Sequence, residues 1–405
     1  MKVPFSPPYI DQDIKTEVEE VLTSGWITTG PKVRAFEKLT VEFCGAQAAL
    51  AVNSATSGLM LSLHWLGIKE GDEVIIPAYT YCATALVVMH AGGKPVMVDV
   101  GDDFNIDVAK IISAITPRTK AIITVDIGGW PCDYQAIADI VNDPVIKANF
   151  NPASEVQRRL GRIMMLSDAA HSLGAEYHRK KIGSLADITV FSFHAVKNVT
   201  TAEGGMICLN MPEPFDNKTI YQTLRVWSLN GQTKDAYTKT VGNSWRYDVV
   251  YPGFKMNMPD VLAAIGFAQM KMYGQLIGKR KQVFACYISK FKKYDWAVLP
   301  KCFENCRESS YHLFLLRIKD ITEEQRDKVI DYVMQKGISV NVHFVPLPLL
   351  TVFKERGYTI ENYPESLKHY QGEISLPVYP QLTSEQISYV TEMLAEAVNN
   401  ILYER

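Results

Sequence analysis

Short β-branched and apolar runs alternate with amphipathic segments through the first two thirds of the chain. Apolar residues at helical spacing occur at 11–22, at 33–43 and after Ser57. Strand-like runs lie at 73–77, 94–100, 120–127, 161–168, 188–193 and 204–210, and further helical patterns lie at 108–115 and 133–141. Because strands alternate with helices, the pattern predicts an α/β layer around a mostly parallel sheet.

The pattern changes after about Asn257. A long helical pattern over 259–291 is followed by strand-like segments at 311–318 and 338–344 and by helical segments at 322–336 and from Ser384. We therefore predict an N-terminal arm at 1–10, a large α/β domain at 11–256, and a linking helix with a smaller α+β domain at 257–405. The polar stretch 142–159 has little periodicity and is predicted to be an inserted surface segment.

Composition narrows the class of protein. Hydrophobic residues make up 47% of the 405 residues and charged residues 21%, and the formal charge is 42 − 44 = −2. No basic run favours nucleic acid, and no apolar run reaches the ~18 residues of a membrane span. The N-terminus lacks a signal-peptide pattern, and the seven scattered cysteines are not at metal-site spacing. We expect a soluble cytoplasmic protein without a metal site.

Lys197 follows a predicted strand in the segment FSFHAVKN (191–198). Most lysines are solvated surface charges. A lysine at the carboxyl edge of a parallel sheet, however, lies where α/β proteins bind ligands. Burial there lowers the pKa of the amine and provides the free base that covalent amine chemistry requires. The glycine pair at 204–205 is interpreted as room for something flat beside the backbone.

Asp168 ends another predicted strand, in SDAAHSLGA (167–175). An Asp at such a position is most often a helix cap. The alternative is specific, since a carboxylate beside a pyridine nitrogen keeps that nitrogen protonated. His171 lies three residues further on, and it faces the same site or packs in the core.

The segment NSATSG (53–58) precedes a helical pattern and is rich in hydroxyl groups. It is either a phosphate site at a helix N-terminus or a simple cap by Ser54 or Thr56. Tyr81 is either a core aromatic or a ring that stacks on a ligand. Along the chain, the candidate phosphate site is followed by the aromatic residue, the Asp and the Lys. This order is harder to explain by chance than any one of these features.

These segments resemble the DegT/DnrJ/EryC1/StrS family of sugar aminotransferases, which depend on pyridoxal phosphate and have the aspartate-aminotransferase fold (fold type I). The resemblance extends over nearly the whole chain, more loosely after about residue 275. It is carried by GWITTGPKVRAFE (25–37), AVNSATSGL (51–59), GDEVIIPAYTYCATA (71–85), SDAAHSLGA, FSFHAVKNVTTAEGGM (191–206) and GFKMNMPDVLAAIG (253–266). The lysine motif is the most specific of these segments.

The resemblance implies a role for each matching residue. Lys197 matches the lysine that binds the cofactor covalently, and Asp168 matches the partner of its ring nitrogen. The other implied contacts are Ala55, Thr56 and Ser192 at the phosphate, Tyr81 and His171 at the ring, Asn257 at the phosphate across a dimer interface, and Thr28 and His343 at the substrate. From the residues alone, Asn257 is a helix cap and His343 a strand residue packed between domains.

The implied reaction transfers an amino group, from glutamate, to a nucleotide-linked keto sugar in a homodimer with shared active sites. The lysine segment is most similar to members that aminate carbon 4 of a UDP-linked sugar, and amination at carbon 3 of a dTDP-linked sugar is the nearest alternative. Some relatives dehydrate sugars, but they have histidine in place of the lysine. A regulator that only binds the cofactor would have lost a catalytic group or gained a DNA-binding module, and this sequence shows neither.

Three features depart from the family pattern. Ser167 stands where the family often has an acidic residue, and Asp126 stands where it usually has a histidine. The insert near 142–160 is longer than the usual connection. None of these removes a catalytic group, but Asp126 and the insert lie where a substrate pocket or an interface is expected.

Overall fold

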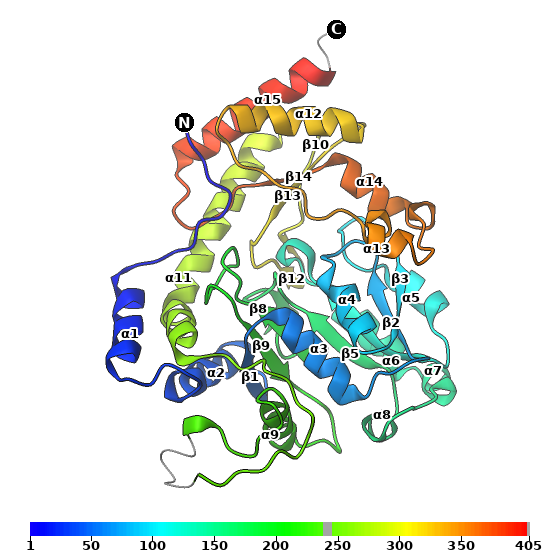
Figure 1. Ribbon diagram of the computed structural model, residues 1–405. Helices are drawn as coiled ribbons and strands as arrows, with labels where there is room; N and C mark the ends of the chain where they lie inside the picture. Colours follow the sequence, from blue (N-terminus) through cyan, green and yellow to red (C-terminus); the bar gives the residue numbers. More distant parts are fainter. Residues whose placement is uncertain (238–244, 403–405) are drawn as a thin grey trace.

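The computed structural model describes residues 1–237 and 245–402, and a seven-stranded sheet forms its centre (Figure 1). The strand order is β1-β9-β8-β5-β4-β2-β3. The strands are β1 (Ala48–Val52), β2 (Glu73–Pro77), β3 (Lys94–Val98), β4 (Thr119–Val125), β5 (Met164–Asp168), β8 (Ile188–Ser192) and β9 (Gly205–Leu209). Strand β9 is antiparallel to β1 and β8, and every other pairing in the sheet is parallel. The predicted mostly parallel sheet is confirmed.

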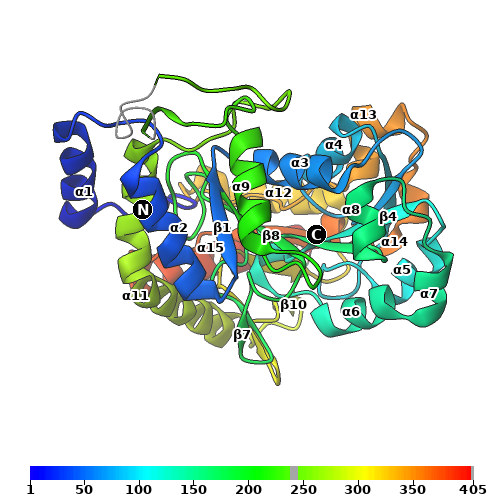
Figure 2. The same cartoon turned by 90° about the horizontal axis from the view of Figure 1, so that it is seen from below.

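Helices cover both faces of this sheet, because successive side chains of each strand point to opposite faces. In β2, Ile75 packs in one apolar layer, whereas Val74 and Ile76 pack in the other. Figure 2 shows the two layers of helices with the sheet between them. The layer against Val74 contains α3 (Ala55–Leu66), α4 (Ala83–His90), α8 (Glu155–Leu160) and α9 (Asn217–Trp227), and the opposite layer contains α2 (Pro31–Cys44), α5 (Val108–Ala114), α6 (Tyr134–Asn142) and the start of α11 (Asp260–Phe291).

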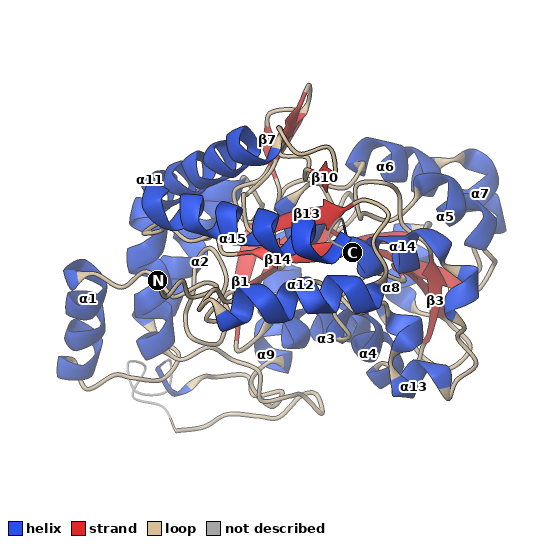
Figure 3. Ribbon diagram, turned by 90° about the horizontal axis from the view of Figure 1, so that it is seen from above, coloured by secondary structure: helices blue, strands red, loops and turns tan. Residues whose placement is uncertain are grey.

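The C-terminal part has its own sheet and its own apolar core. Helix α11 is 32 residues long and runs from the layer beside α2 to this second core, where it packs against α15. The second sheet is antiparallel, in the order β10-β13-β14, and α12 and α15 lie over it (Figure 3). The bounds are β10 (Ala297–Val298), β13 (Phe314–Ile318), β14 (Glu373–Leu376), α12 (Glu323–Gln335), α13 (Thr351–Lys354), α14 (Pro364–Gly372) and α15 (Ser384–Leu402).

A narrow ribbon of four short strands joins the two parts of the chain. Its order is β11-β12-β6-β7, so that segments far apart in the sequence pair with each other. These strands are β6 (Glu176–Tyr177), β7 (Lys180–Lys181), β11 (Phe303–Glu304) and β12 (Arg307–Glu308). No helix in the described part of the chain combines the length and apolarity of a membrane span.

Most of the predicted helices and strands form where the periodicity places them, and the main omissions are β1, α4, α9, α14 and β14. The stretch 142–159 is more ordered than predicted, because it forms α7 (Pro144–Asn149) and α8. Asp143 and Ser154 cap these two helices, and the buried Gln157 side chain donates a hydrogen bond to the Leu66 carbonyl. Polar residues at caps and at one buried contact obscure the periodicity of such short helices.

The predicted strand at 338–344 is wrong. Its backbone makes only isolated bridges, from Ile338 to Val3 in the N-terminal arm and from Asn341 to Ser375 in β14. Alternating apolar residues can indicate a strand even where no neighbouring strand runs alongside to pair with it. The arm is therefore attached to the C-terminal part through Val3, and the division of the chain after residue 256 stays a prediction.

The buried carboxylate of Asp260 connects the long helix to the start of α2. Its oxygens accept hydrogen bonds from the backbone N–H groups of Gly30, Lys32 and Val33. These donors lie at the N-terminus of α2, where backbone N–H groups have no partner within the helix. Asp260 itself is the first residue of α11. One side chain thus holds the two helices together at their N-termini.

Asp260→Ala is expected to lower the free energy of unfolding by about 3 kcal/mol, because three backbone N–H groups lose a charged acceptor. Urea denaturation followed by circular dichroism measures the change. Asp13→Ala, which alters an exposed residue of α1 (Gln12–Thr23), is the matched control and should have little effect. Equal effects of the two substitutions would contradict the structural role of Asp260.

Candidate active site

A cavity of about 410 Å³ lies at the carboxyl ends of the parallel strands. Asp168 ends β5 and Ser192 ends the neighbouring β8, and both side chains line the cavity. The carboxyl edge of a parallel sheet is where ligands bind in open α/β folds. Eight of the ten residues predicted for the site line this one cavity: Ala55, Thr56, Tyr81, Asp168, His171, Ser192, Lys197 and His343.

Lys197 lies in a tight turn after β8. The turn is closed by hydrogen bonds from the Lys197 N–H to the His194 carbonyl and from the Thr201 N–H to the Phe193 carbonyl. Burial lowers the pKa of the Lys197 amine to about 8, and the negative charge of Asp168 opposes this shift. The amine therefore exists partly as the free base near neutral pH, which is the form that reacts with carbonyl groups.

Asn198, the residue after Lys197, fixes this turn through hydrogen bonds of its side chain. Its amide nitrogen donates to the Ser310 carbonyl at 2.8 Å and to the Tyr273 hydroxyl at 3.2 Å. Its amide oxygen is 2.9 Å from Nδ1 of His312. The sequence pattern did not single out Asn198, because its partners come from the C-terminal part of the chain. It is a positioning residue for the lysine.

Asp168 is buried, and both of its oxygens accept hydrogen bonds. Oδ2 accepts from the Thr84 hydroxyl at 2.8 Å, and Oδ1 accepts from the Ala170 N–H at 3.3 Å. Burial raises the pKa of Asp168, while these hydrogen bonds and the charge of Lys197 oppose the rise. Asp168 does not cap a helix, since β5 is followed by a turn. Its carboxylate is held in place to interact with a group inside the cavity.

The N-terminus of α3 forms another wall of the cavity. Ser54 caps the helix, because its hydroxyl accepts a hydrogen bond from the Ser57 N–H. Ala55 and Thr56, in the first turn, line the cavity beside Ser192. The cap by Ser54 is therefore confirmed, and the helix N-terminus also faces the cavity. The unpaired N–H groups and the helix dipole favour an anion there.

Gly205 serves packing of the backbone. A Cβ atom at this position would lie 2.5 Å from the carbonyl carbon of Ser54 and 2.6 Å from the nitrogen of Ala55. Only glycine allows β9 to approach the start of α3 so closely. The interpretation of Gly204 and Gly205 as room for a flat group is therefore wrong at position 205, where glycine lets the start of α3 approach the sheet.

Aromatic rings form the rest of the wall. Tyr81 is 59% exposed, and its ring is 5.9 Å from that of Phe344, another lining residue that the sequence analysis missed. His171 is buried, and its Nδ1 accepts a hydrogen bond from the Gly128 N–H, so the ring proton is on Nε2. Burial lowers the pKa of His171 well below its usual value, and nearby Lys197 adds to this effect. The His171 side chain is therefore neutral.

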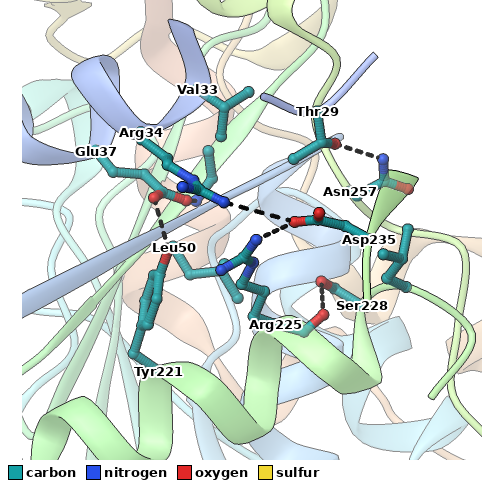
Figure 4. Close-up of a pocket in the computed structure, with 12 residues that line it drawn as sticks. Thr29, Val33, Arg34, Glu37, Leu50, Tyr221, Arg225, Ser228, Asp235 and Asn257 are labelled. Atoms are coloured by element: carbon teal, nitrogen blue, oxygen red, sulfur yellow. Dashed lines mark hydrogen bonds and ion pairs between the residues drawn. The ribbon is translucent and has the colours of Figure 1, made fainter. Parts of the chain in front are cut away.

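Two predicted residues, Thr28 and Asn257, do not line this cavity. The Asn257 amide donates to the Thr29 hydroxyl at 2.7 Å, and both side chains line a separate cavity of about 20 Å³ (Figure 4). Thr28 is exposed, and its carbonyl accepts from the Asp260 N–H. Neither Thr28 nor Asn257 therefore contributes to the wall of the 410 Å³ cavity in its own chain.

Two of the three departures from the family pattern, Asp126 and Ser167, form one buried network. The Tyr134 hydroxyl is 2.8 Å from Asp126 Oδ2 and 2.7 Å from the Ser167 hydroxyl. Asp126 also accepts from the Ser172 hydroxyl and from the Cys132 N–H. These side chains lie behind the cavity wall, since Val125 lines the cavity and Asp126 does not. Asp126 therefore supports the strand ends and does not contact a ligand.

Metal and disulfide chemistry are not evident in the described residues. All seven cysteines are free. Within residues 1–237 and 245–402, no three His, Cys, Asp or Glu side chains are grouped so that they can hold a metal ion.

The sequence matches the DegT/DnrJ/EryC1/StrS aminotransferase family over residues 8–395. SpsC of Bacillus subtilis, a spore coat polysaccharide biosynthesis protein, is 34% identical to this chain over 401 residues. The matched region covers 98% of this chain and 97% of SpsC.

Solved structures are similar over the whole chain. Spr1654 of Streptococcus pneumoniae, described as a sugar aminotransferase, is 39% identical in its PMP form, with a TM-score of 0.95. The match covers 99% of this chain and 100% of that one. PseC of Helicobacter pylori, an aminotransferase involved in the biosynthesis of pseudoaminic acid, is 27% identical with a TM-score of 0.84, over 98% of this chain and 99% of PseC.

Lys197→Met is expected to stabilise the ligand-free protein at pH 7. The folded-state pKa of Lys197 is about 8, below its unfolded value of about 10.4, so a charged lysine opposes folding at pH 7. The unfolded chain binds more protons between these values, and the penalty declines as the pH rises through that range. The gain in unfolding free energy should reach about 3 kcal/mol at pH 7 and be much smaller near pH 10.

Thermal unfolding at both pH values tests this expectation. Lys38→Met is the matched control, because Lys38 is an exposed lysine on α2. A Lys197→Met protein that is less stable than the parent at pH 7 would show that the amine does not carry an ionisation penalty.

Proposed function

The chain belongs to the DegT/DnrJ/EryC1/StrS aminotransferase family, and from this premise we propose that it aminates carbon 4 of a UDP-linked 4-keto sugar, with glutamate as the amino donor. It is a pyridoxal 5′-phosphate-dependent sugar aminotransferase with the α/β fold of these enzymes. The single observation that carries the proposal is that Lys197 and Asp168 converge on one buried cavity.

The residues of this cavity fit pyridoxal 5′-phosphate. A volume of about 410 Å³ accommodates the cofactor with part of a substrate. The N-terminus of α3, with Ala55, Thr56 and Ser192, provides a site for the phosphate. Asp168 is the carboxylate for the ring nitrogen, and Lys197 is the amine for the aldehyde. Tyr81 and His171 are the rings that contact the cofactor's ring.

When bound, pyridoxal 5′-phosphate supplies a ring that accepts the electrons released at the α-carbon of the amino donor. Lys197 would hold the cofactor, and its side-chain amine would become free for proton transfer when the amino donor binds. The free Lys197 amine, with its pKa lowered to about 8, then takes the proton from the donor's α-carbon. Asp168 holds a proton at the ring nitrogen, and Thr84 keeps its carboxylate oriented. The same groups act in reverse order on the keto sugar.

A sugar substrate is supported by the relatives. SpsC takes part in polysaccharide biosynthesis, Spr1654 is described as a sugar aminotransferase, and PseC takes part in the biosynthesis of pseudoaminic acid. The segments FSFHAVKN and TTAEGGM around Lys197 are most similar to members that aminate carbon 4 of UDP-linked sugars. The proposal is specific in two respects: the sugar is linked to a nucleotide, and carbon 4 is the carbon that is aminated.

We further propose that the enzyme is a homodimer with shared active sites. Thr28 and Asn257 resemble substrate and phosphate contacts of the family, yet they lie outside the cavity of their own chain. They would act in the site of the partner subunit. The segment that precedes Asn257 also exposes apolar side chains, among them Trp245 at 79% and Val250 at 60%. An apolar surface of this kind is typical of an interface.

Lys197→Ala is expected to lose both turnover and the absorbance band of lysine-bound cofactor, because one amine serves as anchor and base. In the parent protein, glutamate should bleach this band in the absence of sugar. The Lys38→Met protein is the control and should behave like the parent. Turnover that persists in Lys197→Ala would refute the assignment of the lysine.

Incubation with glutamate and a panel of UDP-, dTDP- and GDP-linked keto sugars tests the substrate. Mass spectrometry and NMR of the products should show a 4-amino sugar, formed fastest from a UDP-linked substrate. A 3-amino product from a dTDP-linked sugar would overturn the proposed specificity. Bleaching by glutamate with no amination of any keto sugar would overturn the substrate class.

Mixed dimers test the shared site. Asn257→Ala and Lys197→Ala subunits should each be impaired alone, because every site lacks one group. Co-expressed subunits should recover activity, since one site of the mixed dimer has both groups intact. Activity of the mixture no higher than that of the separate variants would contradict a site completed by the partner subunit.

A further inference from the structure

A pair of buried polar side chains in the C-terminal sheet is linked to the cavity through His343. Glu373 and Ser375 are two residues apart in β14, so their side chains point to the same face of the strand. Their neighbours Ile374 and Leu376 point to the other face and pack in the C-terminal core. Glu373 and Ser375 are both fully buried. A buried carboxyl and a buried hydroxyl thus lie side by side on the face of β14 that is turned away from that core.

An unbroken line of hydrogen bonds leads from this pair to the cavity. The Ser375 hydroxyl is 2.5 Å from Glu373 Oε1 and 2.8 Å from Nδ1 of His343. The backbone N–H of His343 donates to Glu373 Oε2 at 2.9 Å and keeps the three groups close together. The His343 ring lines the cavity that contains Lys197. Because Nδ1 is engaged with Ser375, Nε2 is the ring nitrogen available to a ligand.

We propose that His343, Ser375 and Glu373 form a proton relay between the buried carboxyl and the substrate atom at His343 Nε2. The proposal rests on the proposed function, in which the keto oxygen of the sugar leaves as water. The oxygen takes two protons to become water. The first comes from the nitrogen that adds to the keto carbon, and the second passes from Glu373 to Ser375, from Ser375 to Nδ1, and from Nε2 to the departing hydroxyl. A proton returns along the same line from the nitrogen that replaces this oxygen, so the relay ends each cycle as it began.

The electrostatics of the two end groups agree with such a relay. Burial lowers the pKa of His343 to about 3, and the charge of Lys197 adds to the effect, so the ring cannot store a proton as imidazolium. Burial raises the pKa of Glu373 to about 8, so its carboxyl can store a proton at neutral pH. A proton accepted at Nε2 therefore ends on Glu373, and the imidazole changes only its tautomer.

Several other titratable groups face the relay. Arg326, from α12, donates to the backbone carbonyl of Glu373 and not to its carboxyl. Tyr79, whose pKa is raised well above its usual value by burial and by the charge of Glu373, stays neutral. On the cavity side, the groups that act on His343 or respond to it are Lys197, His171 and His312. None of these five replaces Ser375 as the link between the carboxyl and the imidazole.

The tautomer of His343 provides a test that does not depend on turnover. In full-length, cofactor-loaded protein labelled with ¹⁵N-histidine, the two ring nitrogens are followed by NMR from about pH 6.5 to about pH 9.5. Below the pKa of Glu373 the carboxyl donates through Ser375 to Nδ1, and the proton of His343 is on Nε2. Above that pKa the proton is on Nδ1. The signal missing from His343→Gln identifies the residue.

Ser375→Ala removes the link and should abolish the change of tautomer. Glu373→Gln should hold one tautomer at every pH, and it is the second variant if Ser375→Ala does not fold. Ser62→Ala is the matched control, because it removes a buried hydroxyl from α3 outside the relay. A single tautomer throughout in the parent protein, or the same change in Ser375→Ala as in the parent, would overturn the relay.

Turnover adds an independent measure. General acid catalysis contributes about 10²-fold or more, so Ser375→Ala should lower kcat about 100-fold with little change in KM for the keto sugar. Unchanged kcat in Ser375→Ala would also overturn the relay. Failure of the proposed function is distinguishable, since the change of tautomer would remain while no keto sugar in the panel is aminated.

Discussion

The Lys197 amine and the Asp168 carboxylate are opposite charges that have lost their hydration in the same cavity. Burial lowers the pKa of Lys197 and raises the pKa of Asp168, and the charge of each group opposes the shift of the other. Each group is held by contacts of its own, because Thr84 orients the carboxylate and the contacts of Asn198 hold the turn that contains the lysine. The pair is therefore available to a third group placed between them.

This placement follows from the central sheet. Strands β5 and β8 are parallel neighbours, so the residues that end them emerge at the same edge. The start of α3 reaches that edge because Gly205 lets β9 pack against the backbone of Ser54. Backbone geometry thus fixes the Lys197 amine, the Asp168 carboxylate and the start of α3. The loops contribute the rings around them. Such preorganisation is what an active site requires in order to act on a charge that develops during reaction.

The C-terminal part of the chain completes the cavity, and of its contributions the sequence analysis anticipated only His343. It contributes His343 and Phe344 to the wall, and behind them β14 places Glu373 and Ser375. Two lines of polar contacts therefore lead to the site. One comes from the large sheet through Lys197 and Asp168, and the other from β14 through His343. The N-terminal arm also reaches this region, where Phe5 stacks on the His343 ring at 5.6 Å.

The parts of the site that could be predicted are those that local sequence determines. An apolar run located β5 and a β-branched run located β8, and hence Asp168 and the segment of Lys197. The strand β1 was missed because its sequence AALAV contains mostly alanine, a helix former. The segment 338–344 alternates like a strand but finds only isolated partners. Glu373 and Ser375 lie thirty residues or more from His343 in the sequence, and only the fold brings them together. The predicted roles of Asn257 at the phosphate of a partner subunit and of Thr28 at the substrate stay predictions.

A crystal structure of the cofactor-loaded protein tests most directly whether the amine and the carboxylate act on one bound ring. We expect electron density continuous from Nζ of Lys197 to the cofactor, with the Asp168 carboxylate within hydrogen-bond distance of the ring nitrogen and the phosphate at the N-terminus of α3. A cofactor bound elsewhere, or a ring whose nitrogen points away from Asp168, would contradict the assignment of this cavity as the active site.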